Sequence, residues 1–162
     1  MSGLLQFSFT ELCPEYDAYL AALVRSSLAA HQLDIPGTAY FDDALDHLSD
    51  YYKAPGRAYF VLLSRDTPVG GVGFAPFPGL ENTCEMQKLY LDEAVRGQGL
   101  GYTLVEKVEE EARKLGYRNI YLETHTNLAA AIHIYEKSGY RRINPPESVV
   151  HSTMDHFYLK AL

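Results

Sequence analysis

The residues with the clearest chemical potential form a glycine-rich stretch, Arg96 to Gly101, with the sequence Arg-Gly-Gln-Gly-Leu-Gly. It lies between a strand-like run, Cys84 to Asp92, and an amphipathic helix-like run, Leu100 to Leu115. Glycine lets the backbone approach a ligand closely and adopts dihedral angles closed to other residues. The first N–H groups of a helix have no partner within it, and the helix dipole favours an anion there. The stretch therefore predicts a binding site for the phosphate or pyrophosphate of a nucleotide-type cofactor.

Other glycine patterns must be weighed against this interpretation. The phosphate loop of ATPases and GTPases requires Gly-Lys-Ser/Thr, but Gly101 is followed by Tyr102, which nearly excludes it. The dinucleotide fingerprint could begin at Gly97, yet it requires a small residue where Tyr102 stands. Glu123 lies near the spacing expected of its ribose-binding acid, so this alternative stays open. A purely structural glycine turn is the third alternative.

Hydrophobic periodicity sets this loop among strands and helices. Strands are predicted for residues 4–12, 57–64, 69–75, 84–92, 118–124, 140–143 and 154–161. Helices are predicted for residues 14–28, 41–52, 100–115 and 128–138, the last two ending at Gly116 and Gly139. The order is β-α-α-β-β-β-α-β-α-β-β, a mixed α/β fold with an early hairpin at residues 65–68. That hairpin counts against a doubly wound dinucleotide sheet, which would alternate strands and helices throughout.

Length, charge and cysteine content limit the function classes. A chain of 162 residues fits a single domain, residues 1–162. The formal net charge of −7 argues against a general nucleic-acid partner. Cys13 and Cys84 form neither a disulfide framework nor a metal-binding spacing. No signal-like start and no apolar run of membrane-spanning length occur in the sequence. We expect a cytoplasmic protein with no membrane partner.

Three pieces of the chain, in this order, resemble the GNAT superfamily of acetyl-CoA-dependent N-acetyltransferases. They are the strand Cys84 to Leu91, the loop Arg96 to Gly101 and the segment Asn127 to Tyr140. The loop fits the family pattern Arg/Gln-x-x-Gly-x-Gly/Ala without a departure. The resemblance implies an α/β fold with a mixed, mostly antiparallel central sheet flanked by helices. It also implies an enzyme that moves the acetyl group of acetyl-CoA to a primary amine of a small molecule or peptide.

The resemblance further implies which residues bind the cofactor. Loop amides hold the CoA pyrophosphate, and the preceding strand pairs with the pantetheine arm where it diverges from the next strand. The Leu91 N–H would also polarise the thioester carbonyl. The broken alternation at residues 89–91 predicts a β-bulge there. The implied cofactor-binding residues are Leu89, Tyr90, Leu91, Arg96, Gly97, Gln98, Gly99, Leu100, Gly101, Thr103 and Asn127.

Three of these residues have simpler alternatives. Arg96 can contact phosphate or remain a solvated surface charge. Thr103 can offer its hydroxyl to the pyrophosphate or face solvent in the first helical turn. Asn127 can bind the cofactor arm, as the resemblance implies, or cap the helix that follows it.

Transfer to an amine requires proton movements. An alkyl ammonium has a pKa of ~10.4, so only about one part in a thousand is neutral at pH 7. Glu85 stands where the family often has a catalytic glutamate, and burial on a strand would raise its pKa toward the working range. We expect it to act as a general base, directly or through water; pairing with a neighbouring cation is the alternative. Tyr135 stands at the family position for the acid that protonates the leaving thiolate, or is simply a core tyrosine.

The acceptor site and its surroundings are less defined. Acidic and aromatic residues gather in the region of the first two predicted helices and their connecting loop. They suit the binding of an amine with an apolar body, or they form the solvated face of a helix. These residues are Asp34, Tyr40, Phe41, Asp42, Asp43, Asp46, Tyr51 and Tyr52. An amino acid, a polyamine, an aminoglycoside and a peptide N-terminus all stay open. His125 and His133 occupy no catalytic position of the family, and the scattered histidines support no metal site.

Two other functions compete with transfer. One is a non-catalytic acyl-CoA-binding regulatory module, and the other is a nicotinamide-nucleotide enzyme or binder. Glu85 and Tyr135 together favour the enzyme over the regulatory module. Homodimers through the late strands are expected by analogy alone.

Overall fold

The structure of the protein, a computed structural model, describes residues 6–149 and 151–162. Within them the order β-α-α-β-β-β-α-β-α-β-β is confirmed. The strands are β1 (Phe7–Glu11), β2 (Ala58–Ser64), β3 (Thr67–Pro76), β4 (Thr83–Leu91), β5 (Asn119–Thr124), β6 (Arg141–Arg142) and β7 (His156–Ala161). The helices are α2 (Asp17–Ala30), α3 (Leu48–Tyr51), α4 (Leu100–Lys114) and α5 (Ala129–Lys137). Four 3-10 turns accompany them: η1 (Pro14–Tyr16), η2 (Ala39–Phe41), η3 (Leu45–His47) and η4 (Glu93–Val95). Leu4 and Leu5, predicted to begin the first strand, lie outside the described residues.

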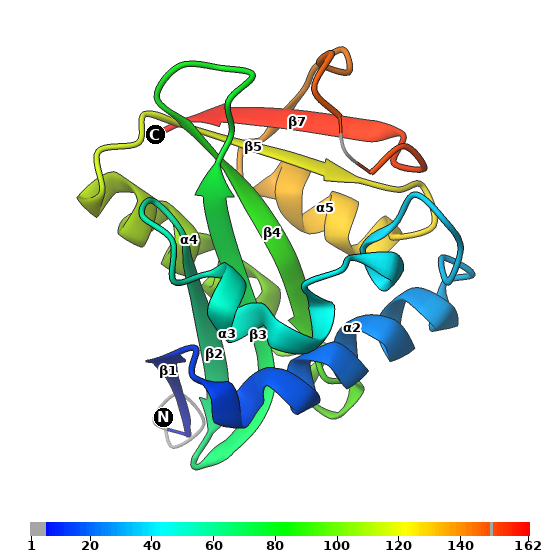
Figure 1. Ribbon diagram of the computed structural model, residues 1–162, viewed down its shortest axis with the longest axis vertical. Coiled ribbons are helices and arrows are strands. Elements are labelled where there is room, and N and C mark those ends of the chain that lie inside the picture. Colours follow the sequence, from blue (N-terminus) through cyan, green and yellow to red (C-terminus); the bar gives the residue numbers. More distant parts are fainter. Residues whose placement is uncertain (1–5, 150) are drawn as a thin grey trace.

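The described strands form one sheet in the order β1-β2-β3-β4-β5-β7-β6 (Figure 1). Every neighbouring pair is antiparallel except β4 and β5, which are parallel. The expectation of a mixed, mostly antiparallel sheet is therefore confirmed. This topology contradicts the doubly wound dinucleotide sheet, which is built from parallel strands.

Helices cover both faces of this sheet (Figure 1). Apolar residues of α4 and α5 pack on one face, and those of α2 and α3 pack on the other. The predicted apolar stripe of α4 is confirmed at Leu104, Val108 and Ala112, whose side chains are fully buried. Leu115, predicted to continue that stripe, is 58% exposed because the helix ends at Lys114.

The second predicted helix, residues 41–52, is wrong over most of its length. The segment forms η2, η3 and the single helical turn α3. The Asp17 carboxylate of α2 accepts hydrogen bonds from the Ser49 N–H (2.9 Å) and the Ser49 hydroxyl (2.6 Å). These contacts tie the segment to α2 and satisfy backbone groups outside a continuous helix.

Glycines end α4 and α5 as predicted. Gly116 and Gly139 have φ values of 89° and 92°, which favour glycine. After α5 the Tyr140 N–H donates to the Tyr135 carbonyl (3.0 Å), so this residue still belongs to the helix end. The strand predicted for residues 140–143 is consequently reduced to Arg141–Arg142.

The predicted bulge is present in β4. The pairing of β3 with β4 shifts between Gly71 and Gly73, where one residue of β3 opposes Lys88 and Leu89 of β4. Lys88 has a φ of 53°, an uncommon left-handed conformation for a residue other than glycine. The bulge therefore begins one residue before the predicted span, 89–91, and redirects the end of the strand.

The pairing of β4 with β5 ends early. It includes three residue pairs and stops at Glu85 and Tyr121. Beyond this point β4 continues to Leu91 and β5 to Thr124, and the two strands diverge (Figure 1). Their separation opens a gap within the sheet, and the gap positions the candidate site.

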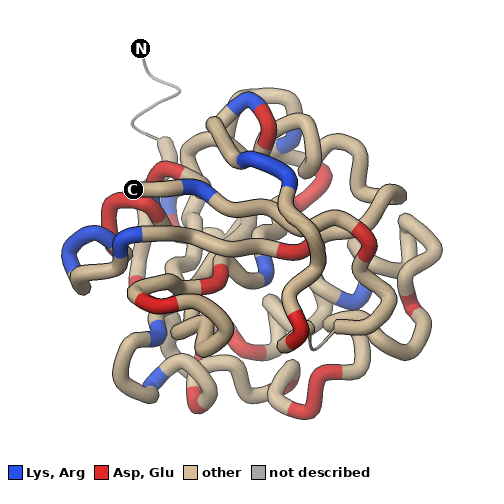
Figure 2. The backbone as a smooth tube through the Cα atoms, turned by 90° about the horizontal axis from the view of Figure 1, so that it is seen from above, with Lys and Arg blue, Asp and Glu red and all other residues tan. Residues whose placement is uncertain are grey.

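Charged residues are distributed around the chain. Figure 2 shows Lys and Arg interspersed with Asp and Glu along the described backbone. Among the described residues, each helix is too short or too polar to cross a membrane.

Close packing of α4 against α5 generates a first prediction. A Cβ added at Gly101 would collide with Cδ1 of Ile134. We expect Gly101→Ala to shift the free energy of unfolding by less than about 1 kcal/mol, because Cδ1 is the free end of a side chain that can rotate away, and alanine favours a helix over glycine by roughly 0.5–1 kcal/mol. Thermal melting measures the shift. Ile134→Val, which removes the colliding methyl, should cost less stability in the Gly101→Ala protein than in the wild type, and equal costs would contradict the proposed contact.

Candidate active site

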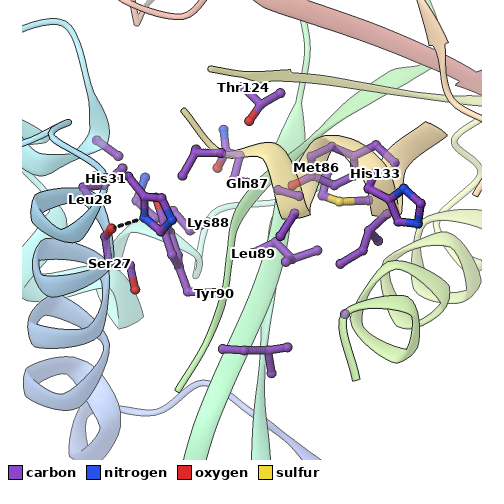
Figure 3. A pocket seen from close by; sticks show the side chains of 18 of the residues that line it. Ser27, Leu28, His31, Met86, Gln87, Lys88, Leu89, Tyr90, Thr124 and His133 are labelled. Carbon is purple, nitrogen blue, oxygen red and sulfur yellow. Dashed lines mark hydrogen bonds between the residues drawn. The ribbon is translucent and has the colours of Figure 1, made fainter. Parts of the chain in front are cut away.

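A cavity of about 500 Å³ occupies the gap between β4 and β5. It passes through the sheet, with α2 lining it on one side and α4 and α5 lining it on the other. In Figure 3, Leu28 of α2 and His31, just beyond the end of that helix, face Lys88 and Tyr90 of β4, whereas His133 of α5 lies on the other side of the strand. The cavity is long enough to reach from the glycine loop to the middle of the sheet.

The glycine loop forms one end of this cavity. Gly97 and Gly99 have φ values of 81° and 79°, and open space surrounds the position of a Cβ at each. Among the described residues, the backbone N–H groups of residues 97–101 have no hydrogen-bond acceptor. These unpaired donors stand at the start of α4, where the helix dipole favours an anion.

The end of β4 turns its free backbone groups toward the gap. The Asp92 N–H donates to the Val69 carbonyl of β3 (2.7 Å). Because backbone groups alternate along a strand, the N–H and C=O of Leu91 point away from β3. The Arg96 guanidinium donates to the Leu91 carbonyl, with its Nε and Nη2 each at 3.3 Å. The Leu91 N–H remains directed into the cavity.

Most of the predicted cofactor-binding residues line this cavity. Gln98 and Thr103 do not: the Gln98 amide donates to the Val95 carbonyl (3.4 Å), and the Thr103 hydroxyl lies 3.5 Å from the Gly99 carbonyl. The predicted residues that line the cavity are Leu89, Tyr90, Leu91, Arg96, Gly97, Gly99, Leu100 and Gly101.

Asn127 also lies outside the cavity lining. Its side-chain amide donates to the His31 carbonyl just beyond the end of α2 (2.9 Å). The alternative expectation that Asn127 caps α5 is wrong, because Leu128 occupies the N-cap and no side chain caps the helix. Asn127 instead connects the β5–α5 loop to α2 at the edge of the cavity.

Glu85 lies where β4 and β5 separate, and its side chain lines the cavity. Burial raises the pKa of this carboxyl to about 7, and the nearby Glu123 adds to the rise. A hydrogen bond from the Gln87 amide to Glu85 Oε1 (2.9 Å) opposes it in part. A carboxyl with this pKa can gain and lose a proton near neutral pH.

Sequence reasoning missed the role of Gln87. The Tyr52 hydroxyl donates to Gln87 Oε1 (2.8 Å), and Gln87 in turn donates to Glu85. These two hydrogen bonds fix the orientation of the Glu85 carboxyl. Period-2 alternation puts Gln87 on the same strand face as Glu85, and that signal could have identified it.

Tyr135 lies on α5, and its side chain lines the cavity although it is 7% exposed. Burial raises its pKa above the usual value for tyrosine, so the phenol is protonated at neutral pH. Its ring packs against Tyr140 and Tyr158, with centroids 6.1 and 6.4 Å away. Tyr135 is thus a core residue whose protonated phenol borders the cavity.

A second cavity of about 340 Å³ adjoins the first. Glu85, Gln87, Lys88, Glu123 and His151 line both cavities. Glu85 therefore stands at the junction between the gap and the second cavity.

A cluster of charges forms one wall of the second cavity. Asp42 lies 2.8 Å from both Lys88 Nζ and His151 Nε2, and His151 Nδ1 lies 3.3 Å from Glu123. Burial opposes the charge on His151, but hydrogen bonds to Asp42 and Glu123 outweigh it and raise its pKa to about 9. Burial likewise opposes the charge on Asp42, and the hydrogen bonds from His151 and Lys88 hold its pKa below the usual value.

The predicted acceptor residues divide between this cavity and other places. Asp42, Asp43 and Tyr51 line it. Asp46 pairs instead with Arg25 (2.8 Å), and Tyr52 is buried beneath Gln87. The others lie outside this lining: Asp34 is exposed, and the Tyr40 and Phe41 rings contact each other.

His125 and His133, which occupy no catalytic position of the family, lie in different places. His133 lines the first cavity, whereas His125 accepts a hydrogen bond from the Asn127 N–H (3.0 Å) in the turn after β5. Within residues 6–149 and 151–162, no group of three or more His, Cys, Asp or Glu side chains could hold a metal ion.

Comparison with known proteins identifies relatives of this chain. The sequence model of the acetyltransferase (GNAT) family matches residues 25–140. The uncharacterized N-acetyltransferase YjgM of Escherichia coli (strain K12) is 39% identical over 127 residues, which cover 77% of this chain and 76% of that protein.

Solved structures share the fold. An acetyltransferase of the GNAT family from Staphylococcus aureus Mu50 superposes with a TM-score of 0.81 at 20% identity, over 96% of this chain and 99% of that chain. The yncA protein of Salmonella typhimurium, solved with its cofactor acetyl-CoA, gives 0.75 at 21% identity, over 97% and 94%.

The buried carboxyl of Glu85 should make stability depend on pH. Its pKa lies above the ordinary value of 4.5, so folding favours the protonated form and the contribution of this group falls as pH rises from about 4.5 to 7. We expect Glu85→Gln to raise the free energy of unfolding at pH 8 by roughly 1–3 kcal/mol, with no gain below pH 4.5. Urea unfolding across this range measures the difference. Glu106→Gln, on the exposed face of α4, is the control, and a Glu85→Gln protein less stable than wild type at pH 8 would contradict the argument.

Proposed function

The chain belongs to the acetyltransferase (GNAT) family, and we propose that it transfers the acetyl group of acetyl-CoA to a primary amine of a small molecule or peptide. One observation carries the proposal. Unpaired N–H groups of residues 97–101 stand at one end of the gap between β4 and β5, and the buried Glu85 carboxyl stands at the other.

Acetyl-CoA suits this gap as the acyl donor. The N–H groups of the glycine loop would bind its pyrophosphate, with Arg96 beside them. The backbone groups of Leu89 and Leu91 would pair with the amides of the pantetheine arm, as a further strand would. A relative's structure in complex with acetyl-CoA supports this choice of donor. Gln98, Thr103 and Asn127 lie outside the cavity lining, and their contact with the cofactor stays a prediction.

Three groups of the chain would perform the transfer. Glu85 accepts the proton of the incoming ammonium, directly or through water, and so releases the nitrogen lone pair. The Leu91 N–H donates to the thioester oxygen as negative charge develops on it. The freed nitrogen attacks the thioester carbon and forms the carbon–nitrogen bond. As the carbon–sulfur bond breaks, Tyr135 donates its proton to the sulfur, and the second proton that the nitrogen loses restores the phenol. The thioester of acetyl-CoA supplies the activated acetyl group, and no metal takes part in the proposed steps.

The pKa of Glu85 suits its proposed role. A carboxyl with a pKa near 7 is both substantially ionised at neutral pH and basic enough to accept a proton from an ammonium in a buried site. The hydrogen bonds that link Tyr52, Gln87 and Glu85 would hold the Glu85 carboxyl in place throughout the catalytic cycle. A cytoplasmic location and a homodimer stay predictions.

Coenzyme binding can be tested at the loop. Gly99→Ala adds a side chain where the pyrophosphate would lie, and Gly116→Ala adds one at the other end of α4 with a similar positive φ and open surroundings. Both variants should lose about 1 kcal/mol of stability, because alanine resists this backbone conformation. Only Gly99→Ala should lose the rise in melting temperature that acetyl-CoA causes.

A nicotinamide nucleotide serves as the contrasting ligand in the same experiment. NAD should leave the melting temperature unchanged for the wild type and both variants. Protection by NAD and not by acetyl-CoA would refute the proposed cofactor.

The proton-transfer roles predict specific kinetics. Glu85→Gln and Tyr135→Phe should each lower kcat by about 100-fold or more, measured as thiol release from acetyl-CoA in the presence of an amine. The rate of the wild type should rise with pH through an apparent pKa of about 7, since only ionised Glu85 accepts a proton. That rise should disappear in Glu85→Gln.

Tyr140→Phe is a matched control for Tyr135→Phe. The Tyr140 hydroxyl is buried in the same aromatic group and does not line the cavity. Its removal should leave kcat within about twofold of wild type. Equal losses in the two phenylalanine variants would argue for a packing role of Tyr135 alone.

A further inference from the structure

The second cavity lies where an acceptor would meet the proposed base. It shares Glu85 with the cofactor gap, so a molecule bound there has its reactive nitrogen at the junction of the two cavities. Its volume of about 340 Å³ is near the lower end of the range for ligand pockets. The part of the acceptor held there must be compact.

The cations of this cavity are already neutralised. Lys88, whose side chain is 9% exposed, lies 2.8 Å from Asp42. His151 contacts Asp42 at 2.8 Å and Glu123 at 3.3 Å, on its two ring nitrogens. A carboxylate entering the cavity would have to displace one of these acids to gain a cation of its own.

The acids of the cavity exceed its cations. Asp42, Asp43, Glu85 and Glu123 line it, against Lys88 and His151. An ammonium is attracted by this excess, whereas a carboxylate loses its water and meets like charge, which is costly in an enclosed site. The electrostatics therefore favour a cationic acceptor and disfavour an anionic or zwitterionic one.

The remaining wall is apolar and rigid. Phe77 stacks on Tyr121 with ring centroids 4.0 Å apart, and Tyr51 and Tyr52 pack edge to face at 4.7 Å. Such walls favour an apolar or aromatic body on the amine. The apolar lining residues are Ala44, Leu48, Tyr51, Pro76, Phe77 and Pro78.

We propose that the acceptor is a compact primary amine with an apolar body and no carboxylate, and that Asp42 enforces this choice by occupying Lys88 and His151. The inference rests on the transferase function proposed above and narrows its substrate class. It excludes free α-amino acids, which carry a carboxylate next to the amine. It also disfavours aminoglycosides and long polyamines, which carry several charged or polar groups and no apolar body to pack on this wall.

Three acceptors of matched shape test the charge preference on the unmodified protein. Phenethylamine has no carboxylate, L-phenylalanine has one, and L-phenylalanine methyl ester has it masked. Thiol release should give a kcat/KM for phenethylamine at least about tenfold above that of L-phenylalanine, with the ester close to phenethylamine. A kcat/KM for L-phenylalanine equal to or above that of the other two would overturn the proposal, as would turnover of kanamycin or spermidine alone.

Asp42→Asn tests how the preference arises. It should release Lys88 and His151 to bind a carboxylate, so the ratio of kcat/KM for phenethylamine to that for L-phenylalanine should fall by about tenfold. Asp46→Asn is the control, because Asp46 pairs with Arg25 and does not line the cavity. An unchanged ratio in Asp42→Asn would refute the role of Asp42. The ratio is insensitive to a general loss of stability, and the wild-type comparison stands if this variant does not fold.

Binding separates failure of this inference from failure of the transferase function. Calorimetric titration of the three acceptors into the CoA-saturated protein reports their order of affinity without turnover. The same preference in binding, with no thiol release from any amine, would support the cavity's selectivity and refute the transfer. Thiol release with the reverse preference would support the transfer and refute the selectivity.

Discussion

The early end of the pairing between β4 and β5 is the constraint on which the rest of the structure depends. Beyond Glu85 and Tyr121, one side of β4 has backbone N–H and C=O groups without a partner strand. Buried backbone groups left unpaired are costly, and apolar side chains cannot satisfy them. The helices on either face leave the gap open instead of filling it. An extended ligand with its own amides is the natural partner for such an edge.

The same constraint sets the chemistry of Glu85. The carboxyl stands where the two strands separate, so it is enclosed by the sheet and yet open to both cavities. Its raised pKa follows from this enclosure, and the Gln87–Tyr52 chain keeps it from turning toward solvent. The raised pKa therefore lowers the stability of the protein at neutral pH, at the residue that the proposed mechanism uses as a base. Such a cost is common at functional sites.

The features that could be predicted from the sequence are those set by residues close together along the chain. The order of elements, the glycine loop and the helix-ending Gly116 depend on near neighbours along the chain, so periodicity and backbone preference were sufficient. The helix predicted for residues 41–52 is instead broken into 3-10 turns and one helical turn, and Asp17, 32 residues away, binds that helical turn through Ser49. The pairing of Asp42 with His151 joins residues 109 positions apart, and no local pattern indicates such a contact. Burial of Glu85 could be expected from its strand, but not the second cavity beside it.

The bulge connects the two cavities physically. It opens the cofactor side by redirecting the end of β4, and its left-handed residue, Lys88, lies 2.8 Å from Asp42 in the acceptor cavity. The Tyr59 hydroxyl holds the Lys88 carbonyl (2.8 Å), and a Cβ at Gly71 or Gly73 would approach the Tyr59 ring to 2.5 Å. These two glycines thus allow the contact that fixes the bulge. A change at either glycine would disturb the bulge, and with it both the cofactor gap and the charge balance of the acceptor cavity.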